Sequence, residues 1–228
     1  ASKGAVWVAV RIPDDCIAAH ANHSRIHRFP LDDPENCLYS PDVISFAREQ
    51  KYFDGLNRDF SFSAAYAPAG FEELRACEAR VWSFYNRYDS TMVSYLPYIY
   101  GESSTPLPLY IKPDRKLSVQ DMKDAMRDHF EGTPFDMTQD AGAGPFKAPY
   151  RFRPMTFEVD SQEYINERAI ATQQTGFSLV AQQREWLPAA LGGVLWFRRC
   201  QYIGLCAYIC RGAYRSPSLF QRRQRLSL

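Results

Sequence analysis

GAVWVAVRIPDDCIAAHANHSRIHRFPLDDPENCLYS, residues 4–40, is the stretch that decides the fold of this chain. Its run from Ala5 to Ile12 alternates apolar and other residues, which predicts a β-strand. A tight turn at Pro13-Asp14-Asp15 follows, and then a second apolar run, Cys16 to Ala21. The stretch has no initiator Met and no charged segment followed by an apolar one, as a signal peptide would have. Two strands cannot bury both faces alone, so we expect partner strands, and part of a site, outside this chain.

Length and composition fit one large domain, or most of one. The chain has 228 residues with 15 Phe, 14 Tyr and 4 Trp, enough for a sizeable core. No apolar run approaches the length of a membrane span, so we expect no membrane partner. Seven arginines and no acidic residue lie from Arg198 onward, which leaves 20 basic and 26 acidic groups, a net charge of −6, in residues 1–197. This acidic body gives no reason to expect nucleic-acid binding.

The middle of the chain favours helices. Ser40 as N-cap and Pro41 at the first helical position predict a helix that runs to about Gln50. A further helical turn or two is expected over 60–67, and a long helix over 70–88, where apolar residues recur at three- and four-residue spacing. Another helix is expected from the N-cap Ser118 to Gly132, with 89–115 and 132–155 as connecting loops.

Strand patterns return after the helices. The runs 168–174 and 176–183 alternate and meet at Thr175-Gly176, which predicts a hairpin, and 193–197 predicts one more strand. Strands first, helices in the middle and strands last indicate an α+β fold.

Histidines and cysteines invite a metal hypothesis. His20, His23 and His27 lie within eight residues, yet no helix arranges them as in H-E-x-x-H and no further donor follows at a suitable spacing. The six cysteines form no C-x-x-C pair and fit no zinc ribbon. We therefore expect no metal and no other cofactor, and the compartment stays open.

Four residues could carry chemistry. Asn22 follows a strand where the chain turns, and its amide could donate to an oxyanion or bind its own backbone. Arg80, in the helix CEARVWSF, could project into a cleft or lie along the surface. Cys16 and Cys77 lie within apolar patterns, which favours inert buried thiols. No G-x-S-x-G, phosphate-binding loop or dinucleotide fingerprint occurs.

Several blocks together carry a resemblance to a known family. GAVWVAVRIPDDCIAAHAN, FPLDDPENCLYSPDVISFA, CEARVWSFYNRY, ERAIATQQTGFSLVAQQREWLP and GGVLWF occur in this order from about residue 4 to 197. They resemble dipeptidase A-type cysteine dipeptidases, which are N-terminal-nucleophile hydrolases related to bile salt hydrolases and penicillin V acylases.

The resemblance implies a partial αββα sandwich and hydrolysis of a dipeptide substrate without a metal. In such enzymes a cysteine at the processed N-terminus is the nucleophile and its own α-amino group is the base. That cysteine precedes everything in this chain, so we expect the chain to be an inactive fragment. Asn22 corresponds to the family's oxyanion-hole Asn, and Arg80 to the Arg near the nucleophile.

The tail departs from the family. Where the family continues with an acidic strand of the type DDAxxSVYxP, this chain has the basic, Cys-rich sequence RRCQYIGLCAYIC. A back-translation of Arg198 to Tyr208, moved by one base, encodes Asp-Asp-Ala-Asn-Thr-Ser-Val-Tyr-Ala-Pro. Our hypothesis is that 198–228 is an out-of-frame translation that follows a dipeptidase domain at 1–197.

Other functions stay open at this point. An amidase acting on acylated amino acids or bile salt conjugates would use the same machinery. A non-catalytic binding domain would use the basic tail to bind nucleic acid or acidic lipid headgroups. No pattern in the sequence indicates which dipeptides are preferred. The sequence is also compatible with a homo-oligomer.

Overall fold

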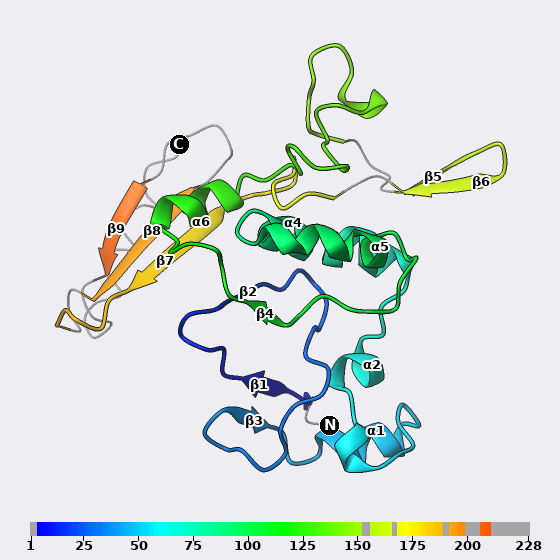
Figure 1. Cartoon of the computed structure of the whole chain (residues 1–228), viewed down its shortest axis with the longest axis vertical. Helices are drawn as coiled ribbons and strands as arrows, with labels where there is room; N and C mark the ends of the chain where they lie inside the picture. Colours follow the sequence, from blue (N-terminus) through cyan, green and yellow to red (C-terminus); the bar gives the residue numbers. More distant parts are fainter. Residues whose placement is uncertain (1–3, 152–155, 166–167, 189–191, 199–205, 211–228) are drawn as a thin grey trace, which may run out of the picture. The chain divides into compact units, whose positions relative to one another are not determined.

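A computed structural model describes residues 4–151, 156–165, 168–188, 192–198 and 206–210. Helices and small antiparallel sheets alternate along these segments, so the predicted α+β class is confirmed (Figure 1). The chain forms two units. The first comprises residues 1–117 and 127–173, and the second comprises 118–126 and 174–228.

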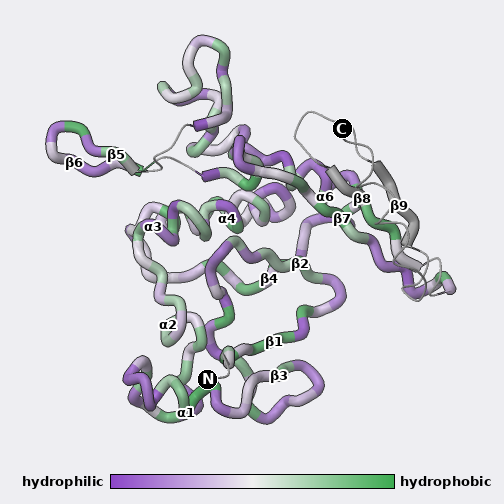
Figure 2. The backbone as a smooth tube through the Cα atoms, turned by 180° about the vertical axis from the view of Figure 1, so that it is seen from behind, coloured by the Kyte–Doolittle hydropathy of each residue, from purple (hydrophilic) through white to green (hydrophobic). Residues whose placement is uncertain are grey.

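The opening stretch forms shorter strands than its pattern predicts. Strand β1 (Val8–Val10) pairs antiparallel with β3 (Cys37–Tyr39), and β2 (Ile17–Ala18) pairs antiparallel with β4 (Tyr110–Ile111). The two apolar runs therefore find separate partners far along the chain (Figure 1). The hydrophobic β1 stands out against its polar surroundings in Figure 2.

Helix α1 (Val43–Glu49) confirms the predicted helix but begins later than expected. Its N-cap residue is Asp42, so the prediction that Ser40 caps the helix was wrong. The reason is that the Ser40 hydroxyl accepts a hydrogen bond from the Trp7 backbone N–H at 3.2 Å instead. One face of α1 buries Val43, Ile44 and Ala47 against Phe60.

The predicted turn at 60–67 is confirmed as helix α2 (Phe62–Tyr66), capped by the Ser61 side chain. The predicted helix over 70–88 is also present, in three consecutive pieces. They are α3 (Phe71–Glu73), a π-helical turn (Leu74–Glu78) and α4 (Ala79–Asn86). Helix α4 is the most deeply buried element, and its Trp82 and Tyr85 have almost no exposed surface.

Residues 89–115 were expected to be a loop, and this was wrong in part. The segment contains a 3₁₀ helix (Ser90–Tyr95), helix α5 (Leu96–Ile99) and strand β4. Proline near the start of α5 is compatible with a helix because the first helical N–H groups have no partner within it. The segment is ordered by burial: Met92 and Ile99 are buried, and the Trp82 indole donates to the Met92 carbonyl at 2.8 Å.

A buried ion pair joins the opening stretch to the helices. Arg25 is 2% exposed and its Nε lies 3.0 Å from Glu78 Oε1. Its Nη1 donates to the Ala19 carbonyl and the Tyr85 hydroxyl, and its Nη2 donates to the carbonyls of Leu107 and Pro108. All five guanidinium N–H groups are thus used, and three separate segments meet at one side chain.

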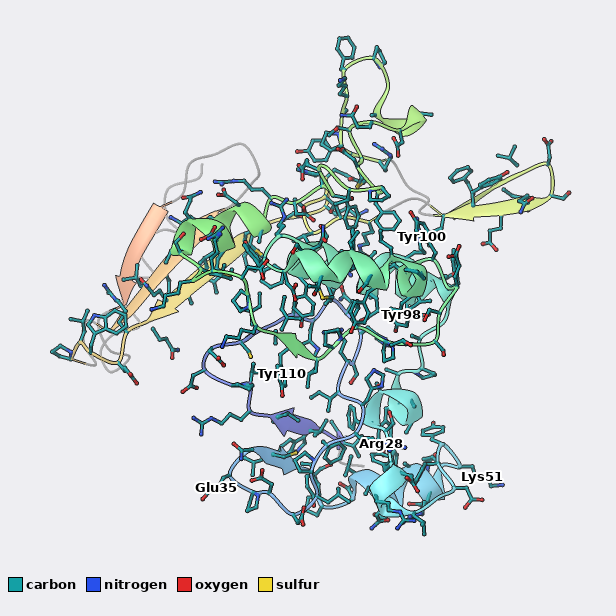
Figure 3. The ribbon with its side chains drawn as sticks, viewed as in Figure 1. Arg28, Glu35, Lys51, Tyr98, Tyr100 and Tyr110 are labelled. Carbon is teal, nitrogen blue, oxygen red and sulfur yellow. The ribbon has the colours of Figure 1, made fainter. Side chains whose placement is uncertain are left out.

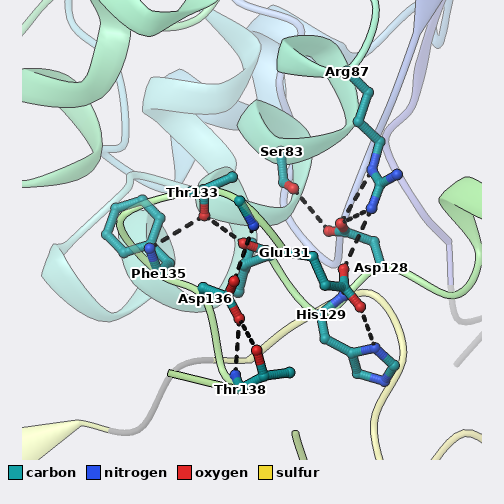
Figure 4. A network of polar contacts seen from close by, with 11 residues as sticks. Ser83, Arg87, Asp128, His129, Glu131, Thr133, Phe135, Asp136 and Thr138 are labelled. Carbon is teal, nitrogen blue, oxygen red and sulfur yellow. Dashed lines mark hydrogen bonds and ion pairs between the residues drawn. The ribbon is translucent and has the colours of Figure 1, made fainter. Parts of the chain in front are cut away.

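A second polar network ties residues 128–131 to Ser83 of α4 and to Arg87 at its C-terminal end (Figure 4). The Asp128 carboxylate accepts from the Ser83 hydroxyl at 2.7 Å and from Arg87 Nε at 3.1 Å. Glu131 lies between Arg87 and His129 and contacts both. Because Asp128 is 1% exposed, these contacts supply the partners that a buried carboxylate requires.

Farther along the first unit, β5 (Thr156–Val159) and β6 (Gln162–Ile165) form a hairpin. Its two-residue turn consists of Asp160 and Ser161, both at positive φ, as a tight hairpin turn requires.

The second unit consists of helix α6 and a three-stranded sheet. Helix α6 (Val119–Ala125) begins with the predicted Ser118 cap, whose hydroxyl and the Asp121 carboxylate bind each other's backbone N–H. It ends before Gly132, contrary to expectation, because the next residues leave the helix and bury Asp128.

The sheet has the order β7-β8-β9. Strand β7 (Ser178–Gln183) pairs with β8 (Gly193–Arg198), which confirms the strand predicted at 193–197. The expected strand at 168–174 was wrong, since its described part forms turns and buries Ala169 and Ala171. Strand β9 (Cys206–Cys210) pairs with β8, and most of the remaining tail lies outside the described residues.

Removal of one partner of the buried ion pair should be costly. We expect Arg25→Met to lower the free energy of unfolding by about 3–5 kcal/mol, because it leaves the Glu78 carboxylate buried without its cation. Arg28→Met is the matched control: Arg28 is 71% exposed and lies 3.7 Å from Asp59, so about 1 kcal/mol or less should be lost. Urea unfolding of the two variants gives both values. Equal losses would contradict this account.

Candidate active site

The two sequence-predicted site residues contact each other although they are 58 positions apart in the chain. Arg80 Nη2 donates to the Asn22 side-chain oxygen Oδ1 at 3.0 Å and lies 3.4 Å from the Ala21 carbonyl oxygen. Asn22 comes from the turn after β2, and Arg80 from the second residue of α4. The structure therefore brings the predicted amide and guanidinium together.

Local structure places Arg80. It lies two residues after the end of the π-helical turn Leu74–Glu78, a feature that often occurs at functional sites. Its Nε donates to the Ala76 carbonyl at 2.7 Å, which ties the side chain back along its own helix. Burial lowers the pKa of Arg80 from its ordinary value, yet a guanidinium stays charged at neutral pH. Within the described part of the chain, no acceptor binds its Nη1.

Asn22 has a left-handed backbone, with φ of 60°. Asn tolerates this conformation better than most residues, which accounts for the residue type at a sharp turn. Arg80 can only donate hydrogen bonds, so the amide oxygen must face it. The amide –NH₂ of Asn22 therefore points away from Arg80, and the exposed side chain presents two donors to solvent.

The cysteines are placed differently from one another. Cys77 is buried, and its Sγ lies 3.9 Å from Arg80 Nη2. Cys16 lies beside Asp15, which also binds Lys112 at 2.8 Å. Burial and the Asp15 carboxylate raise the pKa of the Cys16 thiol, which makes it a poorer source of thiolate.

The three histidines do not converge. His20 is exposed, whereas His23 and His27 line a pocket, and His27 Nδ1 lies 2.7 Å from the Ser63 hydroxyl. Among the residues that the structure describes, no group of three or more His, Cys, Asp or Glu side chains could hold a metal ion. No helix in the same set of residues is long and apolar enough to cross a membrane.

Sequence reasoning missed this pocket of about 200 Å³, whose lining includes His23, the residue that follows Asn22 in the chain. Its walls come from residues 23–25 and 27, from 63–64 of α2, from 67–69, and from Glu78 and Tyr98. Tyr98 is on α5 (Figure 3). Burial and the nearby Glu78 carboxylate raise the pKa of Tyr98 to about 12, so its hydroxyl stays protonated. A signal for Glu78 did exist, because positions 74, 78, 81 and 85 follow one helix face that is otherwise apolar.

Comparison with known proteins gives the class and then the family. The relatives found are dipeptidases, so the class is that of peptide hydrolases. The sequence profile of Peptidase family C69 matches residues 1–204, and the chain belongs to that family. The predicted resemblance to dipeptidase A-type cysteine peptidases is thereby confirmed.

Individual relatives are distant. A probable dipeptidase of Salmonella dublin is 28% identical over 192 residues, which are 84% of this chain and 39% of the relative. A probable dipeptidase of Latilactobacillus sakei is 28% identical over 190 residues, 83% of this chain and 35% of the relative. Dipeptidase A of Lactobacillus helveticus is 25% identical over 197 residues, again 83% and 35%. The chain thus spans less than two-fifths of the length of these relatives.

His27, which lines the pocket, should make the stability of the protein depend on pH. Burial, and next the Arg25 cation, lower the pKa of His27, so the folded protein holds that proton less tightly than the unfolded chain does. The contribution of His27 to the free energy of unfolding is therefore fully present above the ordinary His pKa of about 6.5. It is lost as the pH falls through the lower pKa that His27 has in the folded protein. Urea unfolding at pH 7.5, 6.5 and 5.5 should show the advantage of wild type over His27→Asn shrinking with acid. A constant difference would contradict this assignment.

Proposed function

We propose that this chain carries the oxyanion-stabilising part of a dipeptidase active site, with Asn22 as the oxyanion donor and Arg80 as the residue that orients it. The observation that carries the proposal is the 3.0 Å hydrogen bond from Arg80 Nη2 to Asn22 Oδ1. A donor-only partner fixes which end of the amide faces outward. An outward –NH₂ at a turn is the group that can stabilise negative charge on a carbonyl oxygen.

The proposed chemistry is hydrolysis of a dipeptide through a thioester. A cysteine thiolate attacks the scissile carbonyl, and the oxygen becomes an anion that accepts a hydrogen bond from Asn22. The C–N bond then breaks, and the amine leaves with the proton that the α-amino group of the cysteine took from its thiol. Water attacks the thioester, releases the acid product and regenerates the thiol.

The nucleophile of this proposal is an N-terminal cysteine outside the chain, completing an αββα sandwich, as the family resemblance implies. The described cysteines support this assignment by their placement. Cys37 and Cys77 are buried, and Cys16 contacts the carboxylate of Asp15. A cation at Arg80 lies at the place where it could hold an incoming thiolate, because its Nη1 has no acceptor among the described residues.

An amidase acting on acylated amino acids is the second candidate, because the same donor geometry would serve any amide carbonyl. The dipeptidase relatives favour the first candidate. Hydrolysis of L-alanyl-L-alanine against that of an N-acyl amino acid separates the two.

The assay compares this chain with a version extended upstream in its natural reading frame, so that a cysteine can become N-terminal. We expect hydrolysis only by the extended form. Activity in neither form would refute the proposal. Activity in the short chain that is lost in Cys77→Ala would identify Cys77 as the nucleophile. The proposed reaction class would then still hold.

In the active form, Asn22→Gly should lower kcat by about 10²–10³-fold with little change in KM, because the lost interaction is strongest in the transition state. Glycine keeps the left-handed backbone, so the amide alone is removed. Asn36→Gly is the matched control, since Asn36 is exposed and binds Asp33. A kcat for Asn22→Gly within threefold of wild type would show that Asn22 is not the oxyanion donor.

A further inference from the structure

The hydroxyl group of Tyr85 bridges two strands at the point where their ladder ends. The antiparallel ladder of β2 and β4 ends with the pair Ala18 and Tyr110, and the same register puts Ala19 opposite Leu109. Tyr85 Oη accepts from the Ala19 backbone N–H at 3.2 Å and donates to the Leu109 carbonyl at 2.7 Å. One side-chain oxygen thus takes the place of a direct N–H···O=C bond and holds the two backbones apart.

This bridge is buried and fully bonded. Tyr85 comes from α4, which lies beside β2 and β4 in Figures 1 and 2, and it has no exposed surface. Arg25 Nη1 also donates to Tyr85 Oη, at 3.3 Å, and to the Ala19 carbonyl, at 3.0 Å. Both backbone polar groups of Ala19 therefore bind buried side chains, where water does not compete for them.

Helix α4 also holds the other end of the short segment 19–22. Arg80 Nη2 donates to Asn22 Oδ1 at 3.0 Å and lies 3.4 Å from the Ala21 carbonyl oxygen. The first residue of the segment is thus bound by Tyr85 and the last by Arg80, which are five positions apart on one helix. Because the strand pairing ends before this segment, side chains of α4 take over the task of fixing the backbone there.

We propose that Tyr85 is a positioning residue for the oxyanion donor: its hydroxyl sets where the chain leaves β2, and thereby where Asn22 presents its amide –NH₂. This inference rests on the proposed function, since it concerns the same donor. Tyr85 does not touch the substrate and acts through Asn22. Without the hydroxyl, the Ala19 N–H and the Leu109 carbonyl can approach each other and extend the ladder by one pair, which displaces the turn.

Tyr85→Phe in the extended enzyme removes the hydroxyl and keeps the buried ring. We expect kcat for L-alanyl-L-alanine to fall at least about tenfold with KM within about twofold of wild type, because a displaced donor weakens binding of the transition state more than that of the substrate. Tyr66→Phe is the matched control and should leave kcat unchanged, since it also removes a hydroxyl that donates to a backbone carbonyl, that of Val43. A kcat for folded Tyr85→Phe within about threefold of wild type would overturn the inference.

A double variant separates positioning from a general loss of structure. If Tyr85 acts through Asn22, Tyr85→Phe should not lower kcat further when Asn22→Gly is already present. Losses that multiply would show a merely structural role and overturn the inference, while the proposed function would stand. An unchanged kcat in Asn22→Gly alone would refute the donor assignment of the proposed function, and this inference with it.

Hydrogen exchange on the wild-type chain tests the bridge without any variant. The Ala19 amide lies beyond the last ladder pair, yet we expect it to exchange at least about 10²-fold more slowly than in an unstructured peptide, because its bond to Tyr85 is buried. Exchange within about threefold of the unstructured rate would overturn the inference. Thermal unfolding checks that Tyr85→Phe is folded before its kcat is interpreted.

Discussion

The buried ion pair between Arg25 and Glu78 is the interaction on which the first unit depends. It joins the stretch after β2 to the π-helical turn before α4, and the same guanidinium binds the carbonyls of Leu107 and Pro108. Burial of two charges is repaid only when the geometry is good and the remaining donors and acceptors are satisfied. Arg25 meets that condition, because all five of its N–H groups have acceptors, and both Glu78 oxygens lie within 3.1 Å of its Nε.

The ion pair also positions the site. Asn22 lies three residues before Arg25, and Arg80 lies two residues after Glu78. The ion pair therefore fixes both segments that carry the site. The Asn22–Arg80 hydrogen bond then gives the amide a direction. In this account, Arg25 and Glu78 position the site, Arg80 orients the donor, and Asn22 meets the substrate. Each role follows from burial and from the number of N–H groups that each side chain can offer.

Local patterns predicted much of the fold and less of the site. The Ser118 cap and the apolar spacing over 70–88 predicted helices correctly because both depend on residues close in sequence. The Ser40 cap was wrong since its hydroxyl binds Trp7, and the partners of β1 and β2 could not be predicted because they lie far along the chain. Asn22 and Arg80 were candidates from their positions at a turn and in a helix, the family resemblance suggested their roles, and their contact is seen in the structure. The pocket could not be predicted because it depends on the contact between Arg25 and Glu78, which no spacing in the sequence indicates.

The central claim is that Asn22 presents its –NH₂ to the reacting carbonyl because Arg80 holds its oxygen. A crystal structure of the extended enzyme with a bound dipeptide aldehyde tests this most directly, because a thiol adds to the aldehyde carbonyl and leaves an oxygen where the oxyanion forms. We predict that this oxygen lies within hydrogen-bond distance, about 2.7–3.1 Å, of Asn22 Nδ2, with Oδ1 still on Arg80. An oxygen bound by other donors, with Asn22 turned away, would contradict the account.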